Sequence, residues 1–170
     1  DALTETQIAS VKKLTHVTSV TESLSDRLTT DNTNLKSAVD AGSLGQRFSS
    51  NSGQKVEAGP TFVMQDKNSD GSVTTSFTPP VTVLGTTDPA KSLASSQGGG
   101  TFTLKSGKIF ASDSSENIAI VGSSIATKNN LTVGSTFTAY GKTVTVVGSF
   151  DTGNPFSNNQ IIMAVAAVQT

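Results

Sequence analysis

The stretch from Asn117 to Phe150 constrains the fold more than any other part of the chain. Ile118 to Val121 is a short, β-rich apolar run that Gly122 stops, which predicts a buried strand. Ser123 or Ser124 is then placed to cap a short helix, because a serine hydroxyl accepts from the free N–H groups of a first turn. A strand followed at once by a helix is the start of a compact α and β unit.

A hairpin completes this unit. Asn129 and Asn130 suit a left-handed helix end. Two strands are predicted beyond them, over Thr136 to Tyr140 and Lys142 to Val147, with Gly141 supplying the turn. Gly148, directly after the second strand, is expected to end it.

The order of residues in this unit resembles the extracytoplasmic core domain of MacB/FtsX-type ABC transporter permeases. In that family a strand that ends in Gly is followed by a segment with a characteristic Ala. Two apolar residues and a Gly come next, and then a valine-rich hairpin that ends in Gly. Ser135 stands where the family often has Asp. The residues that fall on the pattern are Ala126, Leu131, Val133, Gly134, Val144, Val146, Val147 and Gly148.

Other segments extend the resemblance. The sequence VTVLGTTDP, from Val81, is similar to a family segment in which a central strand leads into a short helix; Asp88 is placed to cap that helix and Pro89 to begin it. Leu104 to Phe110 and the closing run Ile161 to Val168 also resemble family elements. The match covers 81–170 well, 4–20 weakly and 29–59 not at all.

The N-terminal segment predicts a helix from about Glu5 to Leu14. Thr4 and Gln7 form a capping-box pattern, in which the side chain of each residue accepts a hydrogen bond from the backbone N–H of the other. Ile8, Val11 and Leu14 fall on one face of this helix, which we expect to join the core.

The middle of the chain predicts a smaller lobe. A strand over 20–28 is expected to precede it, as part of the core, and 35–39 is expected to form a helical turn. Thr61 to Gln65 and Ser72 to Phe77 read as a hairpin. The overall prediction is an α+β, two-lobed MacB-like domain with a mixed sheet and short helices. Residues 1–28 and 78–170 would form the core lobe, and 29–77 an inserted β-containing lobe.

Composition excludes several classes of function. Only 15% of the 170 residues are charged and the net charge is -1, without a basic run, which argues against a nucleic-acid binder. The absence of Cys excludes disulfides, thiolate catalysis and Cys-ligated metals. The longest apolar run, Ile161 to Val168, is too short to cross a bilayer. Because the chain begins at Asp1 and shows no signal peptide, we expect an excised or processed fragment. The resemblance implies that transmembrane helices flank it at both ends.

No segment carries the pattern of an active site. Asp66 to Gly71 matches the first half of a calcium loop, but Phe77 stands where the bidentate Glu belongs, so a polar hairpin tip is the simpler interpretation. His16 is the sole histidine and is assigned a surface role near the helix end. Ser123 and Ser124 lack the Gly-x-Ser-x-Gly frame of a nucleophile, and no Gly-Lys-Ser/Thr follows Gly98 to Gly100.

The remaining candidates are carboxylates and apolar residues near the C-terminus. Asp113, Glu116 and Asp151 lie in loop-like stretches and are most simply solvated. Four residues are candidates for an apolar contact rim: Phe150, Phe156, Ile161 and Ile162. For Ile161 and Ile162 the core interpretation is favoured. Phe156 lies in a loop rich in Gly, Pro and Asn, which is a fair place for contact with a partner.

Function therefore follows from the resemblance alone. It implies a domain on the extracytoplasmic side of the cell membrane, in a permease that couples ATP hydrolysis by a cytoplasmic subunit to export or mechanical signalling. It also implies a permease dimer and a protein or peptide partner outside, with no enzyme activity, catalytic residue, cofactor, metal or nucleic acid. The alternative is a free-standing adhesive or structural β-rich surface module, for which the Thr, Ser and Asn content is equally apt. An enzyme is the weakest option, because no nucleophile is paired with a base.

Overall fold

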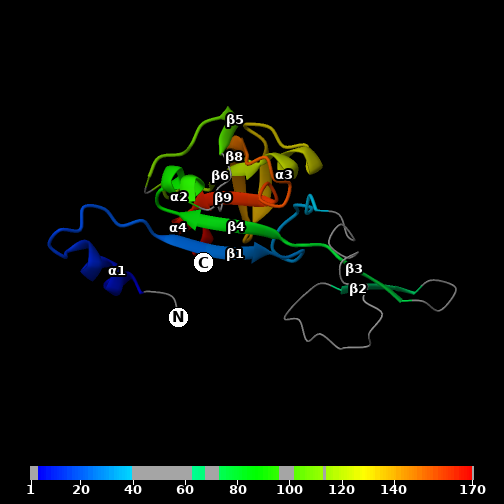
Figure 1. Cartoon of the computed structure of the whole chain (residues 1–170), viewed down its shortest axis with the longest axis horizontal. Coiled ribbons are helices and arrows are strands. Elements are labelled where there is room, and N and C mark those ends of the chain that lie inside the picture. The colour runs from blue at the N-terminus through cyan, green and yellow to red at the C-terminus, as the bar shows by residue number, and fades with distance from the viewer. Residues whose placement is uncertain (1–3, 40–62, 68–72, 96–101, 113, 170) are drawn as a thin grey trace.

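The computed structural model describes residues 4–39, 63–67, 73–95, 102–112 and 114–169 (Figure 1). Its main body is a seven-stranded mixed sheet with short helices against it. The α+β class with a mixed sheet is confirmed. Among the described residues, no helix is long and apolar enough to span a membrane.

The sheet runs in the order β1-β4-β9-β6-β8-β5, with β7 pairing beside β5 on β8. The pairs β4–β9 and β6–β8 are parallel, and the other pairs are antiparallel. The strands are β1 (Ser23–Leu28), β4 (Val81–Thr86), β5 (Thr103–Gly107), β6 (Ile118–Gly122), β7 (Thr136–Ala139), β8 (Lys142–Asp151) and β9 (Gln160–Ala164).

The core lies at the three central strands. β6 and β9 are buried along nearly their whole length, as expected of continuous apolar runs covered on both faces. β8 alternates instead, with Val144 and Val146 inside and Thr143 exposed. Phe150, the largest fully buried side chain, closes the core beside Phe102, with 5.6 Å between the ring centroids.

Two short helices show how local and distant signals differ. In α2 (Pro89–Ser95), the N–H of Lys91 donates to Asp88 Oδ1 over 3.1 Å, so the predicted cap is confirmed. In α3 (Ser123–Lys128), the predicted serine cap is wrong, because Gly122 is the N-cap and no side chain caps the helix. The carbonyl of Asn158 accepts from Ile125 N over 3.3 Å, so a loop of the distant C-terminal segment satisfies this first turn.

The β7–β8 hairpin is present but differs in detail. Tyr140 and Gly141 have φ of 53° and 70°, which makes a turn with two left-handed residues. Gly148 does not end β8, which continues to Asp151. It allows close backbone approach instead, since a Cβ there would lie 2.7 Å from Lys108 O.

The N-terminal helix α1 (Glu5–Lys12) has the predicted capping box, but the expectation that it joins the core is wrong. Val11 and Leu14 are 39% and 59% exposed, and the described core cluster includes no residue of α1. His16, with φ of 75°, turns the chain after the helix, and the Lys12–Glu22 ion pair of 2.8 Å links the helix to the segment before β1. Figure 1 shows α1 standing apart from the sheet.

The hairpin of β2 (Val63–Lys67) and β3 (Val73–Phe77) forms a separate two-stranded antiparallel sheet, as predicted.

The helical turn expected over 35–39 is wrong: these residues form no helix. They lie against the main body, because the side chains of Asn129 and Asn159 bind their backbone. Val39 at their end is only 6% exposed. The division into two lobes stays a prediction. The short C-terminal helix α4 (Val165–Val168) follows β9 and packs on β4.

Candidate interaction surface

The structure describes several of the residues considered for chemistry. His16 and Glu116 are exposed, and Ser123 and Ser124 are half-buried in the first turn of α3. No group of His, Cys, Asp and Glu among the described residues is placed to hold a metal ion. The tip of the calcium-like segment, Gly98 to Gly100 and Asp113 lie outside the residues that the structure describes.

The four rim candidates separate cleanly. Phe150, Ile161 and Ile162 have no exposed surface, which confirms the core interpretation of the two isoleucines. Phe156 is 47% exposed, so it is the member of this set that faces solvent.

A network of buried polar groups orders the loop that carries Phe156. Asn158 is 4% exposed, and its Oδ1 accepts from the backbone N–H and the hydroxyl of Thr152, at 2.9 and 3.0 Å. Its Nδ2 donates to Asp151 Oδ1 over 2.8 Å. At the tip, Phe156 N donates to Asn154 Oδ1 over 2.9 Å. The loop therefore presents its aromatic side chain from an ordered backbone, which lowers the entropy cost of contact with a partner.

Asp151 anchors this network through its charge. The N–H of Gly153 and then the amide of Asn158 donate to the carboxylate, and with Lys105 nearby they hold the pKa of Asp151 below its usual value. A lowered pKa in the folded state means that this group stabilises the fold above its unfolded pKa of about 3.9, and that the stabilisation is lost as the pH falls through the folded value.

We expect Asp151→Asn to lower the urea midpoint at pH 7, with the difference from the wild-type protein shrinking as the pH falls below about 4. The measurement is a set of urea unfolding curves from pH 7 to pH 2. Midpoints that stay a constant distance apart over this range would contradict a role of the charge in the loop.

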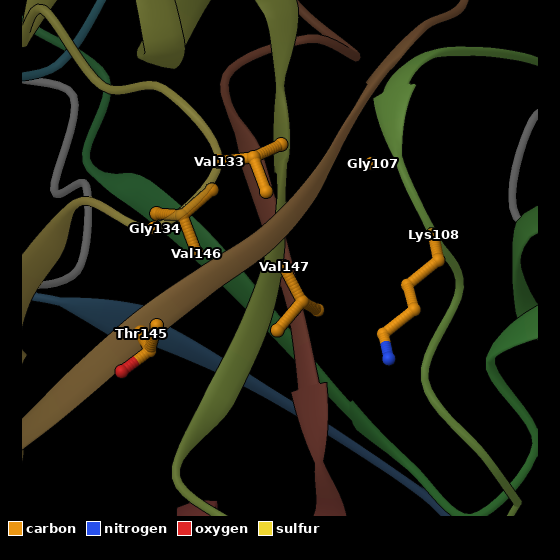
Figure 2. Close-up of a pocket in the computed structure, with 7 residues that line it drawn as sticks. All are labelled: Gly107, Lys108, Val133, Gly134, Thr145, Val146 and Val147. Atoms are coloured by element: carbon orange, nitrogen blue, oxygen red, sulfur yellow. The ribbon is translucent and has the colours of Figure 1, made fainter.

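A second surface feature was not predicted from the sequence. A shallow hollow of about 410 Å³ lies where the end of β5 meets the segment before β7, and Figure 2 shows the residues that line it. Val133, which is 48% exposed, and Val147 line one part of it, and Lys108 lies across from them. Its lining is apolar apart from Lys108 and Thr145, so it suits a small apolar side chain rather than catalysis. The sequence signal was Val133 directly before Gly134, an apolar residue beside a turn.

Comparisons with known proteins find likeness among solved structures. No family model matches the chain, and no curated protein matches it. Among solved structures, the chain is similar to the periplasmic region of MacB from Actinobacillus actinomycetemcomitans, with 13% sequence identity and a TM-score of 0.47. The match covers 94% of this chain and 54% of that one, so the chain spans about half the length of the solved region.

Proposed function

We propose that the chain is the extracytoplasmic domain of a MacB/FtsX-type ABC transporter permease and does no chemistry of its own. The permease would couple ATP hydrolysis by a cytoplasmic subunit to export or to mechanical signalling. The domain would bind a protein or peptide on the extracytoplasmic side of the membrane. The observation that carries the proposal is that four residues of the family pattern have clear structural roles within the unit β6–α3–β7–β8: Gly134, Val144, Val146 and Gly148.

The hairpin gives the clearest reasons. Val144 and Val146 are 0% and 1% exposed, so their apolar character serves the core. Gly134 has a φ of 92°, a conformation that side chains disfavour. Gly148 lies against Lys108 O, where a Cβ would be only 2.7 Å away.

The other matched segments meet one another in space. β4, which carries the VTVLG sequence, pairs in parallel with β9 in the closing run. A Cβ on Gly85 would lie 3.0 Å from Val168 Cγ2 and 3.3 Å from Val165 Cα, so the glycine lets α4 pack closely on β4. A sequence pattern whose separate parts pack together supports a shared fold better than one hairpin would.

Contact with a partner outside the cell is assigned to the loop at Phe156. This side chain is exposed on an ordered backbone, and aromatic side chains are common anchors of protein interfaces. A permease dimer is part of the same proposal.

The proposal predicts that the domain lies on the extracytoplasmic side of the cytoplasmic membrane, in the periplasm or outside the cell. Since the chain has no Cys, Thr143→Cys adds a single exposed thiol on β8, in a parent protein freed of other cysteines. A membrane-impermeant maleimide added to intact cells should label it fully. The matched control is the neighbouring Val144→Cys, whose side chain is buried and should stay unlabelled until the protein is denatured.

Labelling of Thr143→Cys only after the cytoplasmic membrane is permeabilised would contradict the proposal. Sequencing the parent gene separates the alternative: an apolar span of about 20 residues on each side is required of a permease domain. Repeated copies of the domain with a sorting signal would instead support an adhesive module.

A further inference from the structure

Residues 33–39, which we call the strap, follow β1 in the sequence and lie against the main body. They contain one bridge residue and otherwise no helix or strand. At the first end, Thr33 forms an antiparallel bridge with Ala139, and its hydroxyl donates to Thr138 O over 2.7 Å. Thr138 N donates to Asn34 Oδ1 over 2.8 Å. The strap thus begins as a partner of the end of β7.

Further along, side-chain amides of the core bind the backbone of the strap. Asn129 contacts both polar groups of one residue: its Oδ1 accepts from Lys36 N over 2.7 Å and its Nδ2 donates to Lys36 O over 2.8 Å. Asn159 Oδ1 accepts from Ala38 N over 2.8 Å. These two amides therefore act on the strap as the peptide groups of a neighbouring strand would. Such contacts recognise backbone, not side-chain identity.

Two apolar side chains anchor the strap on either side of these contacts. Val39 is 6% exposed, and Leu35 packs against the core cluster. The exposed Lys36 lies between them. Beside Ala38 an open hollow of about 350 Å³ continues the groove along α3, lined by Ser123, Ser124, Thr127 and Lys128.

We propose that the surface between α3, the end of β7 and Asn159 is a binding groove for an extended peptide, and that the strap occupies it in cis. The peptide that fits has apolar residues at two positions four apart, as Leu35 and Val39 are, because the remaining contacts act on the backbone. Backbone hydrogen bonds for affinity and alternating pockets for selectivity are the mode of strand addition. This inference is independent of the transporter proposal.

The strap is suited to leave the groove without unfolding the core. Of its residues Val39 alone is buried, and several of its hydrogen bonds are exposed, which places it among the less stable parts of a fold. A tethered segment competes at an effective concentration in the millimolar range. A free peptide therefore binds in proportion to the fraction of molecules in which the strap is released.

The test is a titration with the peptide TNLKSAV, the sequence of the strap. The double variant Leu35→Ser, Val39→Ser removes the anchors and should bind the peptide at least about tenfold more tightly than the wild-type protein. A peptide with Ser at both apolar positions should not bind. In the same background, Asn129→Ala should weaken binding about tenfold by removing two hydrogen bonds, whereas Glu116→Ala, at an exposed residue away from the groove, should leave it unchanged.

Hydrogen exchange in the wild-type protein provides a second test in case the double variant does not fold. The amides of Lys36 and Ala38 should exchange together and faster than those of Ile161 to Met163 in β9. In an isotope-labelled sample, millimolar peptide should shift the resonances of Asn129 and Ala139. The proposal is overturned if strap amides exchange only with global unfolding, if a folded double variant fails to bind, or if binding is indifferent to Asn129→Ala.

Discussion

Phe150→Ala is expected to lower the free energy of unfolding by about 3–5 kcal/mol, as burial of a whole aromatic ring implies. Phe150 has no exposed surface and packs beside the ring of Phe102. On β8 it lies opposite Gly122 of β6 and Leu104 of β5, so truncation leaves a cavity where three strands meet. Urea unfolding followed by circular dichroism measures the loss.

The matched control is the same substitution at Phe156. That side chain is 47% exposed on a loop, and Phe156→Ala should change the free energy of unfolding by less than about 0.5 kcal/mol. If Phe156→Ala cost as much as Phe150→Ala, the assignment of one ring to the core and the other to the surface would be wrong.

Gly122→Ala should destabilise the fold by at least about 3 kcal/mol, the upper part of the range for overpacking. A Cβ at Gly122 would lie 2.2 Å from Asn158 O and 2.8 Å from Asn158 Cα. These are backbone atoms of an ordered loop, so the clash cannot be relieved by rotation of a side chain. The same carbonyl accepts from Ile125 N, so displacing it also removes a bond of the first turn of α3. Urea unfolding and the exchange rate of the Ile125 amide measure the two effects.

Gly141→Ala is the control for this prediction. Gly141 has a φ of 70°, but a Cβ there would meet nothing within 4 Å. The cost should be that of a left-handed alanine, about 1 kcal/mol. Equal losses for the two variants would show that backbone conformation, not the contact with Asn158, determines the cost at Gly122.

Local signals in the sequence were sufficient for most secondary structure. The capping box at Thr4 and Gln7, and the Asp88 cap before Pro89, depend on residues within three positions, and both are present. The buried runs of β6 and β9 followed from their apolar composition. Hydrophobic pattern and capping chemistry are properties of a short segment, so they can be predicted from the sequence alone.

Local signals failed where a distant segment supplied the partner. The helical turn expected over 35–39 is replaced by the strap, because Asn129 and Asn159 bind backbone groups 93 and 121 residues away along the chain. A serine cap was expected for α3, whereas the Asn158 carbonyl fills that role from the loop after β8. The apolar face of α1 suggested a core helix, yet Val11 and Leu14 are exposed and the described core cluster includes no residue of α1.

The sequence by itself thus determined the α+β class, the capped helices, the hairpins and the central core residues. Tertiary structure alone decided which asparagines bind the strap, that Phe156 is presented on an ordered loop, and that Val133 and Val147 enclose a hollow with Lys108. The physical reason is the range of the interactions. Capping and hydrophobic periodicity act over a few residues, whereas hydrogen bonds that join distant segments exist only after the sheet has brought those segments together.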